Sequence, residues 1–463
     1  MEVLQRTANR GSISTGYDID NSLKLEADDS QYIDDRHYTA GNRKKLTISF
    51  WFKRTELGQT QMPYEQSALQ ARIYLRSTDD LYITAYDNSG WTIITNRLFR
   101  DTSAWYHCVF QLDTTQSTAA DRMKLWINGQ QETSFSSASY PTQNADTYFN
   151  TNQSAKVGGG GAGLYFSGYM SEFFFIDDQA LQASDFGEYD SDSGIWIPKE
   201  YDGTFGGQSY YLEFKNASNL ADRSDGLSNG VSLSVQNITS ADQATDTPTN
   251  NFATYNALLP YNSNGKLIEG ATKFYNGSGG ADTSLSTIAV ASGKWYAEFK
   301  TPSNVAGGNA MVGVAANSGD SVSGRFLGQD AWSVGLLTDG NYRINNSATS
   351  YLGSTWNNTE ILSVALDMDN KKVYFAKNGT WGNSGNPATG TNGIALPSAY
   401  EDYEWFIGAS LVNYTDTFNA SYGGYTTISI SSAETDENGY GTFEYAPPSG
   451  YYALCTKNLA EYG

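Results

Sequence analysis

Residues 46–54 read LTISFWFKR and decide the class of fold. Ile48, Phe50 and Phe52 alternate with Thr, Ser, Trp and Lys, so they share one face of an extended strand. Residues 104–113, AWYHCVFQLD, repeat this period of two. In the following stretch, RMKLWINGQQ, Asn128-Gly129 separates two strand-like runs and suits a type I′ turn. Period-two runs joined by tight turns predict an antiparallel sheet.

The same pattern returns in the second half of the chain. Residues 293–300 read GKWYAEFK, and Asp339-Gly340 and Asp369-Asn370 stand at two expected hairpin tips. The composition agrees, because 33 Tyr, 21 Phe, 10 Trp and 46 Gly among 463 residues favour strands and turns over helices. The sequence therefore predicts an all-β protein with two antiparallel β-sandwich domains.

Changes in composition suggest four segments along the chain. Residues 1–20 are polar and aperiodic and are expected to form an N-terminal arm. Residues 21–215 form the first predicted sandwich and residues 252–463 the second. Between them, residues 216–251 are small, polar and turn-forming, which predicts an inter-domain connector.

Charge and residue counts exclude several classes of protein. The formal net charge of −21 repels nucleic acid phosphates, so nucleic-acid binding is not expected. Cys108 and Cys455 are too few for a disulfide framework and are predicted to be buried thiols. No stretch has the length and hydrophobicity of a membrane span or a signal peptide. We therefore expect that the protein is made in the cytoplasm and does not insert into a membrane.

The first half resembles a LamG-like, concanavalin A-type jelly roll. The stretches that carry the resemblance are SLKLEADDSQYI (22–33), LTISFWFKR (46–54), AWYHCVFQLDTT with KLWINGQQ (104–131) and FSGYMSEFFFIDDQALQASDF (166–186). The second half resembles a SPRY domain through GKWYAEFK (293–300), WSVGLLTDGNYRINN (332–346), ILSVALDMDNKKVYFAKNGTWG (361–382) and EWFIGASL (404–411). Both resemblances imply binding domains and no catalytic centre.

The pairing of these two domains resembles virion proteins of tailed bacteriophages. It implies a non-enzymatic structural protein of the virion, an adhesin or tail-fibre-like component that recognises a host-surface glycan or protein through sandwich loops. The alternatives are a capsid decoration or cement protein that stabilises the head and, from a different class, a glycan-degrading enzyme. Its partners would be other virion proteins and the host surface, and a homo-oligomer is compatible with the sequence.

Candidate catalytic residues are few. His107 and Cys108 are neighbours on a predicted strand and point to opposite faces, so they cannot form a nucleophile and base pair. Glycoside hydrolysis needs two carboxylates on one face, whereas Glu172 and Asp177 have an odd spacing. We therefore expect no catalytic residues and no enzyme activity.

Acidic pairs are the candidates for a metal site. Asp28, Asp29, Asp34 and Asp35 offer hard oxygen ligands of the kind that calcium prefers, but their spacing matches no defined calcium loop. We predict no required cofactor, with calcium as an open possibility at these residues. His37 follows in the stretch DDRHY, where a solvent-facing turn is expected.

Aromatic residues next to turn-forming positions are the candidates for ligand binding, because an exposed ring face can bind the apolar face of a sugar. Four tryptophans lie beside Gly, Asn or Ile-Pro positions that are typical of loops: Trp91, Trp196, Trp356 and Trp381. The alternative for each is a place in the sandwich core.

Overall fold

The computed structural model describes residues 16–66, 68–85, 90–258, 265–277, 280–301, 310–317, 324–412 and 417–463. These residues form two compact units, of which the first ends at Thr249 and the second begins at Asn250. Both units consist mainly of antiparallel sheets, which confirms the predicted all-β fold of two sandwiches. Within the described ranges, no helix has the length and hydrophobicity of a membrane span.

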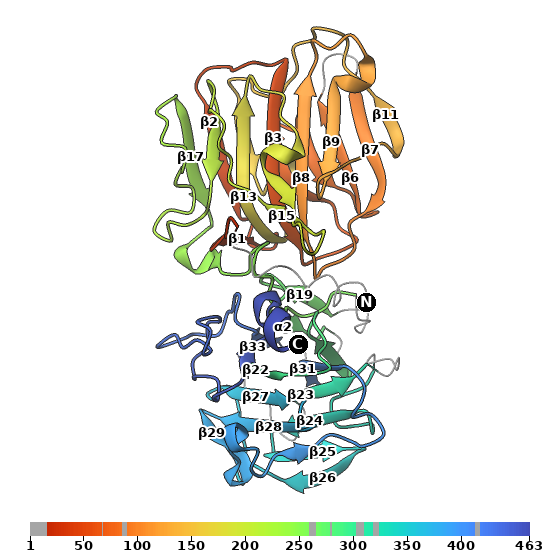
Figure 1. Ribbon diagram of the computed structural model, residues 1–463, viewed down its shortest axis with the longest axis vertical. Coiled ribbons are helices and arrows are strands. Elements are labelled where there is room, and N and C mark those ends of the chain that lie inside the picture. Colours follow the sequence, from red (N-terminus) through yellow and green to blue (C-terminus); the bar gives the residue numbers. More distant parts are fainter. Residues whose placement is uncertain are drawn as a thin grey trace. The chain divides into compact units, whose positions relative to one another are not determined.

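The first unit pairs two large sheets (Figure 1). Sheet A contains, in spatial order, β10 (Gln130–Gln131), β9 (Met123–Ile127), β8 (Trp105–Asp113), β3 (Lys45–Arg54), β13 (Gly168–Asp177), β1 (Ser22–Leu25) and β18 (Gln243–Ala244), and β16 (Tyr210–Leu212) also pairs with β13. Sheet B contains β11 (Phe135–Ser139), β7 (Trp91–Leu98), β6 (Asp80–Ala85), β5 (Ala71–Leu75), β4 (Gln61–Gln66), β12 (Ser154–Val157), β2 (Tyr32–His37) and β17 (Val231–Gln236). A small ribbon adds β14 (Gly187–Tyr189) and β15 (Trp196–Pro198).

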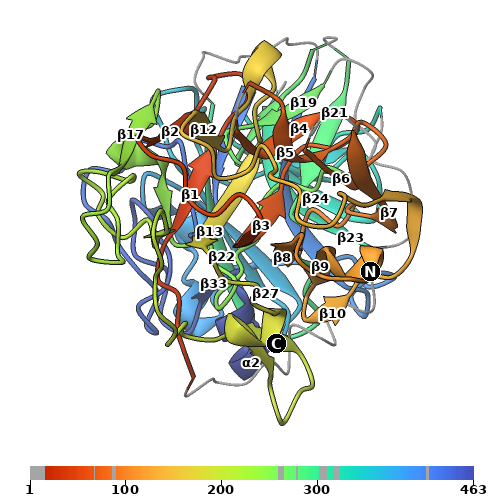
Figure 2. The ribbon, with the colours of Figure 1, turned by 90° about the horizontal axis from the view of Figure 1, so that it is seen from above.

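The core of the first unit lies between sheets A and B. Ile48, Phe50 and Phe52 of β3 point into it, and Cys108 and Phe110 of β8 join them, as the period of two predicts. Strands β3, β8 and β13 lie next to one another in sheet A, which Figure 2 shows from a second direction. The prediction that both cysteines are buried is also confirmed.

The outer face of sheet A is covered as well. Val109, Trp126 and Phe174 from the sheet pack there against Phe186 and Tyr211, which belong to the segment that follows β13. Polar residues of β3 are consequently buried on this face, since water is excluded from both sides of the strand. Sheet A is therefore a central layer with a second, smaller hydrophobic cluster on its outer side.

The segment 216–251 differs from the prediction of a connector. It carries β17 and β18 and belongs to the first unit up to Thr249. Two buried ion pairs hold it: Lys24 Nζ lies 2.8 Å from Asp242 Oδ1, and Lys53 Nζ lies 2.7 Å from Asp246 Oδ2. The segment is polar because its aspartates neutralise lysines that sheet A buries, so its composition does not mark a linker.

The predicted arm is described only in part, because residues 1–15 lie outside the described residues. Within residues 16–20, the Tyr17 hydroxyl lies 3.0 Å from that of Tyr211 on β16. Ile19 is buried and donates its backbone N–H to Thr249 Oγ1 at 3.0 Å. The C-terminal end of the predicted arm is therefore part of the first unit.

The second unit is also a two-sheet sandwich. Sheet C contains β19 (Lys266–Ile268), β20 (Lys273–Tyr275), β32 (Thr417–Ser421), β22 (Lys294–Lys300), β27 (Leu362–Asp367), β28 (Lys372–Lys377) and β29 (Thr380–Trp381), with β30 (Ile394–Ala395) beside β28 and β33 (Tyr452–Ala453) parallel to β22. Sheet D contains β21 (Asp282–Leu285), β31 (Trp405–Leu411), β23 (Ala310–Ala316), β24 (Ser333–Leu337), β25 (Asn341–Ile344) and β26 (Ser347–Ser350). Leu362, Val364 and Leu366 of β27 share one face and lie in the core.

In the part of the chain that the structure describes, helical structure is confined to short pieces. A two-turn helix, α2 (Thr456–Tyr462), follows β33 in the second unit. Single 3-10 turns are η1 (Ala119–Asp121), η2 (Gly161–Gly163), η3 (Ala183–Asp185), η4 (Ser240–Asp242), η5 (Gly382–Ser384) and η6 (Pro387–Thr389).

The predicted hairpin turns are present. Asn128 and Gly129 join β9 to β10 with φ of 48° and 77°, the left-handed conformations that a type I′ turn requires. Gly340 joins β24 to β25 with φ of 82°. Asn-Gly and Asp-Gly pairs were therefore sufficient to locate these turns.

Candidate functional site

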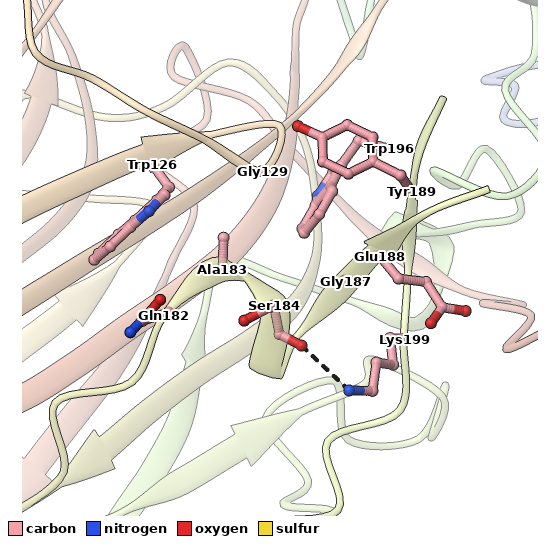
Figure 3. A pocket seen from close by; sticks show the side chains of 10 residues that line it. All are labelled: Trp126, Gly129, Gln182, Ala183, Ser184, Gly187, Glu188, Tyr189, Trp196 and Lys199. Carbon is pink, nitrogen blue, oxygen red and sulfur yellow. Dashed lines mark hydrogen bonds between the residues drawn. The ribbon is translucent and has the colours of Figure 1, made fainter. Parts of the chain in front are cut away.

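A pocket of about 450 Å³ opens on the outer face of sheet A. Its walls are the indoles of Trp126 on β9 and Trp196 on β15, which stand on either side of Ala183 in Figure 3. The remaining lining residues are Gly129, Gln182, Ser184, Gly187, Glu188, Tyr189 and Lys199. The turn of η3 and the β14–β15 ribbon form one side of the pocket, and the β9–β10 turn forms the other.

A buried histidine fixes the orientation of Trp196. The indole Nε1–H of Trp196 donates to His107 Nδ1 at 3.0 Å, and His107 Nε2 lies 2.9 Å from Ser49 Oγ. Burial lowers the pKa of His107 to about 3, so the ring is neutral and Nε2 carries its proton. The Trp51 ring stacks on His107 with a centroid distance of 4.6 Å. Trp196 is therefore held in place before any ligand arrives.

Close backbone approach also constrains Trp196. A Cβ atom at Gly129 or at Gly187 would collide with the indole ring, so both positions need glycine. Tyr189 meets the ring edge-on, with centroids 4.9 Å apart, and its hydroxyl donates to the carbonyl of Asn128 at 3.2 Å. These contacts hold the Trp196 ring in the lining of the pocket.

Polar groups stand around the pocket. The Gln182 and Glu188 side chains are exposed, and Lys199 Nζ donates to the carbonyl of Ser184 at 3.2 Å. The dashed line in Figure 3 marks this last contact. An amide, a carboxylate and an ammonium group thus surround two aromatic walls, an arrangement that suits a ligand with one apolar face and several hydroxyl or amide groups.

The other predicted ligand-binding tryptophans lie elsewhere. Trp91 and Trp356 are each only 2% exposed, so the prediction that their rings face a ligand is wrong. Turn-forming neighbours do not place these two rings on the surface. Trp91 begins β7, and Trp356 reaches into the core, where its Nε1–H donates to the Leu337 carbonyl at 2.7 Å. Trp381 on β29 is half-buried in the second unit and packs against a small hydrophobic cluster. Of the four, only Trp196 lines the pocket.

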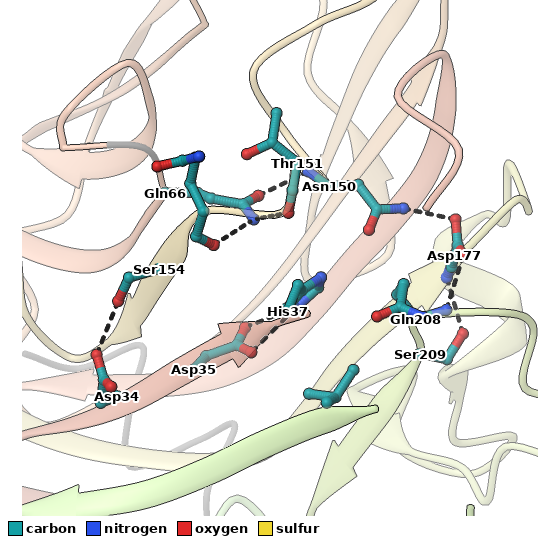
Figure 4. Close-up of polar contacts among 12 residues, drawn as sticks. Asp34, Asp35, His37, Gln66, Asn150, Thr151, Ser154, Asp177, Gln208 and Ser209 are labelled. Atoms are coloured by element: carbon teal, nitrogen blue, oxygen red, sulfur yellow. Dashed lines mark hydrogen bonds and ion pairs between the residues drawn. The ribbon is translucent and has the colours of Figure 1, made fainter. Parts of the chain in front are cut away.

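The four candidate calcium ligands do not converge. Asp28 and Asp29 lie exposed in the turn between β1 and β2. Asp34 and Asp35 point to opposite faces of β2: Asp34 accepts from Ser154 Oγ at 2.9 Å, and Asp35 lies 3.0 Å from His37 Nε2 (Figure 4). Among the described residues, no group of three or more His, Cys, Asp or Glu side chains is arranged to hold a metal ion.

His37 corrects the prediction of a solvent-facing turn residue. It is 1% exposed, lies in β2 and contacts the rings of Phe175 and Tyr210 edge-on. Burial opposes its charged form, but the carboxylates of Asp35 and Asp177 together raise the pKa of His37 above its ordinary value. The polar stretch DDRHY is therefore part of a strand, in which Asp35 and His37 lie on the same face and are hydrogen-bonded to each other in the interior.

Glu172 and Asp177 occupy separate environments. Glu172 lies under the outer face of sheet A, where its Oε2 accepts from Tyr211 at 2.6 Å and from Tyr17 at 3.0 Å. Asp177 instead accepts from the backbone N–H groups of Asn42 and Gln208, at 2.7 and 2.8 Å. Both carboxylates are thus engaged in holding chain segments, and they do not face a common space.

Comparisons with known proteins identify both units. Residues 25–185 match the family model described as the concanavalin A-like lectin/glucanases superfamily, and residues 294–388 match the SPRY domain. The chain therefore carries a concanavalin A-like LamG domain followed by a SPRY domain, which confirms the two resemblances noted in the sequence. A search among curated proteins gave no match.

Solved structures are similar to parts of the chain. The SPRY domain of human HERC1 is 18% identical, with 32% of this chain and 87% of that chain covered and a TM-score of 0.26. A native heptameric SAP-like pentraxin from Limulus polyphemus is 17% identical, with 36% and 80% covered and a TM-score of 0.27. The PSpry domain of TRIM65 is 12% identical, with 36% and 88% covered and a TM-score of 0.28.

Sequence reasoning missed most of the pocket. Trp126 alternates with core residues of β9 and therefore has the pattern of an outer-face residue, which is a usable signal. Tyr189 and Gln182 lie in a segment with no period of two, and their place beside Trp126 depends on how residues 181–211 fold back over sheet A. No local sequence pattern predicts that residues 181–211 fold back over sheet A.

Proposed function

We propose that the protein is a non-enzymatic recognition protein whose LamG domain binds a host-surface glycan or protein at the pocket between Trp126 and Trp196. The observation that carries the proposal is the Ser49–His107–Trp196 chain of hydrogen bonds, which fixes an indole at the pocket wall. A ring that is already immobile loses little conformational entropy when a ligand binds.

A glycan is the favoured ligand. Indole faces bind the apolar face of a pyranose, and amide and carboxylate groups such as those of Gln182 and Glu188 can bond to sugar hydroxyls. A catalytic role is not supported, because Glu172 is covered by two tyrosines and His107 is neutral with both ring nitrogens engaged.

The biological setting we propose is the bacteriophage virion. The support is the resemblance of the LamG and SPRY pairing to virion proteins of tailed phages. In this setting the protein acts as an adhesin or tail-fibre-like component, with other virion proteins as its partners on the particle. Labelled antibody imaged on intact virions tests this, since a signal at the tail supports the adhesin and a signal over the head surface favours a decoration protein instead.

The binding proposal is tested with glycan arrays and titration of the full chain. Trp196→Ala should lower the affinity for any ligand found by at least tenfold, because it removes one aromatic wall. Trp381→Ala, a half-buried tryptophan of the other unit, is the matched control and should bind normally. Tyr189→Ala removes an exposed ring beside the pocket and serves if Trp196→Ala fails to fold. Unchanged affinity in both pocket variants would refute this site.

A further inference from the structure

Strand β17 forms an open edge of the first unit. It pairs with β2 on one side and ends sheet B on the other, as Figure 1 shows. All six of its residues pair with β2 without a register shift. A regular edge of this kind is a template for another strand, and most proteins protect such an edge with charges, proline or a bulge.

The other edge strands of the described sheets are shorter or irregular. Strand β11, at the opposite edge of sheet B, shifts register between Phe135 and Ser137. A bulge of this kind disturbs the ladder and hinders further pairing. The edge strands of sheets A, C and D have four residues or fewer: β10, β18, β19, β29, β21 and β26. Among the described strands, β17 is therefore the edge best suited to accept a partner.

The backbone groups of β17 point in two directions. The Tyr38 N–H donates to the Gly230 carbonyl at 3.4 Å, which marks residues 38 and 230 as a hydrogen-bonded pair at the end of the β2–β17 ladder. Bonded and non-bonded pairs alternate along an antiparallel ladder. The even-numbered residues of β17 therefore bond to β2, and the odd-numbered residues direct their N–H and C=O groups outward.

One of these outward-facing residues already has partners. The Val231 carbonyl accepts from Arg223 at 3.2 Å, and the Val231 N–H donates to Asn229 Oδ1 at 3.4 Å. Within the described ranges, the outward N–H and C=O groups of Leu233 and Val235 have no hydrogen-bond partner. The side chains of these two residues are half-buried at the border of the core. A strand beside β17 would pair the free groups and cover both side chains.

A second copy of β17 fits this edge. The strand reads VSLSVQ, and residues 227–241 carry no charged side chain, although the net charge of the chain is −21. Antiparallel pairing about Ser234 sets Leu233 opposite Val235 of the second copy and Ser234 opposite Ser234. Apolar residues then meet on the core face and serines on the outer face, and no like charges are opposed.

We propose that two copies of the protein associate through β17, antiparallel about a twofold axis at Ser234, so that sheet B continues from one copy into the other. The Leu233 N–H donates to the Val235 carbonyl of the second copy, whose N–H donates back to the Leu233 carbonyl, and the symmetry repeats this exchange. Such an interface uses the same surface on both copies and closes as a dimer.

A dimer carries two copies of the pocket between Trp126 and Trp196. Two binding events on one surface reinforce each other, because the second takes place at a high effective concentration of ligand. This benefit rests on the proposed function, whereas the pairing of β17 does not. A measurement of association alone therefore separates failure of the dimer from failure of the pocket.

Sedimentation velocity of the full chain at increasing protein concentration tests the pairing, and we expect a monomer–dimer equilibrium. Ser234→Lys places two ammonium groups opposite each other and should weaken association at least tenfold. Ser137→Lys, at an exposed serine of β11, is the matched control and should associate like the wild type. A monomer at every concentration would overturn the proposal and favour a strand of a different protein at this edge. Unchanged association of Ser234→Lys would also overturn it.

A cysteine at the same position tests the twofold axis. Across the proposed interface, Ser234 lies in a non-hydrogen-bonded pair with its counterpart, where side chains are close enough for a disulfide. Ser234→Cys should form a disulfide-linked dimer on mild oxidation, detected on a non-reducing gel, since both native cysteines are buried. Ser137→Cys should stay unlinked. A crosslink in both variants, or in neither, would refute the axis at Ser234.

Discussion

Glu298 is a buried carboxylate at the centre of sheet C. It is 0% exposed, and it accepts hydrogen bonds from the Tyr296 hydroxyl at 2.8 Å and from the backbone N–H groups of Glu444 and Tyr445 at 2.7 and 2.9 Å. The residue thereby fastens the loop around residues 444 and 445 to β22. Burial raises the pKa of Glu298 to about 7, against the effect of these hydrogen bonds.

This pKa predicts how the stability of the second unit depends on pH. Because the folded-state pKa lies above the unfolded value, the protonated form stabilises the fold at acidic pH, and this contribution is lost as the pH rises from about 4.5 to 7. The difference in unfolding free energy between the wild type and Glu298→Gln should therefore decrease by roughly 1 kcal/mol per pH unit over that window. Denaturant titrations at pH 5, 6 and 7 measure it.

The exposed Glu434 provides a control for this experiment. Glu434→Gln removes a carboxylate at an exposed position, and its difference from wild type at the three pH values is the baseline for the comparison. The same pH dependence in Glu298→Gln and Glu434→Gln would show that the effect does not come from Glu298.

Gly129 belongs both to the β9–β10 hairpin turn and to the pocket. Its φ of 77° is strained for any other residue, and a Cβ atom there would strike the Trp196 ring. Gly129→Ala should therefore cost about 1 kcal/mol in backbone strain and further stability through the displaced indole. Binding at the pocket should weaken as well.

Gly58 is the matched position for that substitution. Its φ is 72°, but a Cβ atom there meets nothing within 4 Å. Gly58→Ala should show the strain alone, with normal ligand binding, when both variants are compared by thermal melting and titration. Equal losses of stability in the two variants would show that the contact with Trp196 carries no energy.

Of the two ion pairs that hold the segment containing β18, that between Lys53 and Asp246 is the more deeply buried. Lys53 Nζ and Asp246 Oδ2 are 2.7 Å apart, and the Trp105 indole donates to the other oxygen of Asp246 at 3.0 Å. Asp246→Ala leaves the lysine charge buried without this carboxylate, so a loss of about 3–5 kcal/mol in unfolding free energy is expected. Chemical denaturation of the full chain measures it.

A double replacement distinguishes charge from packing. Lys53→Met combined with Asp246→Leu removes both charges at similar volume and should recover most of the stability lost in Asp246→Ala. A double variant as unstable as the single one would mean that the polar contacts, including that from Trp105, are required in themselves.

The sequence predicts the strands and turns well, but it does not predict which distant segments pack on the sheets. The strands of LTISFWFKR and AWYHCVFQLD and the Asn128-Gly129 turn follow from period and turn chemistry, which act over a few residues. The packing of residues 216–249 onto the first unit depends instead on Lys24 and Lys53, about 200 residues earlier in the chain. The same holds for the pocket. The neighbours of Trp196 in the sequence mark it as a candidate, whereas Trp126 and Tyr189 come to the pocket only through the folding of distant segments.

Each of the two units has its own hydrophobic core. The main core cluster of the first unit and that of the second have no residue in common. Residues 16–249 and 250–463, produced as separate fragments, should each fold and unfold cooperatively. Far-ultraviolet circular dichroism during thermal melting checks this, and a fragment without a cooperative transition would show that its core needs the other half of the chain.

The pairing of β1 with β18 has a further consequence. Ser22 pairs with Ala244 in the first unit, and Phe252 bridges Cys455 in the second, so in each unit a segment near its first residues lies beside a segment near its last residues. A domain whose ends adjoin can be spliced into a surface loop of an unrelated protein without stretching either partner. Gene segments that encode such domains can be exchanged between genomes and keep their fold in each new setting, which gives recombination a simple way to combine a LamG domain with a new neighbouring domain.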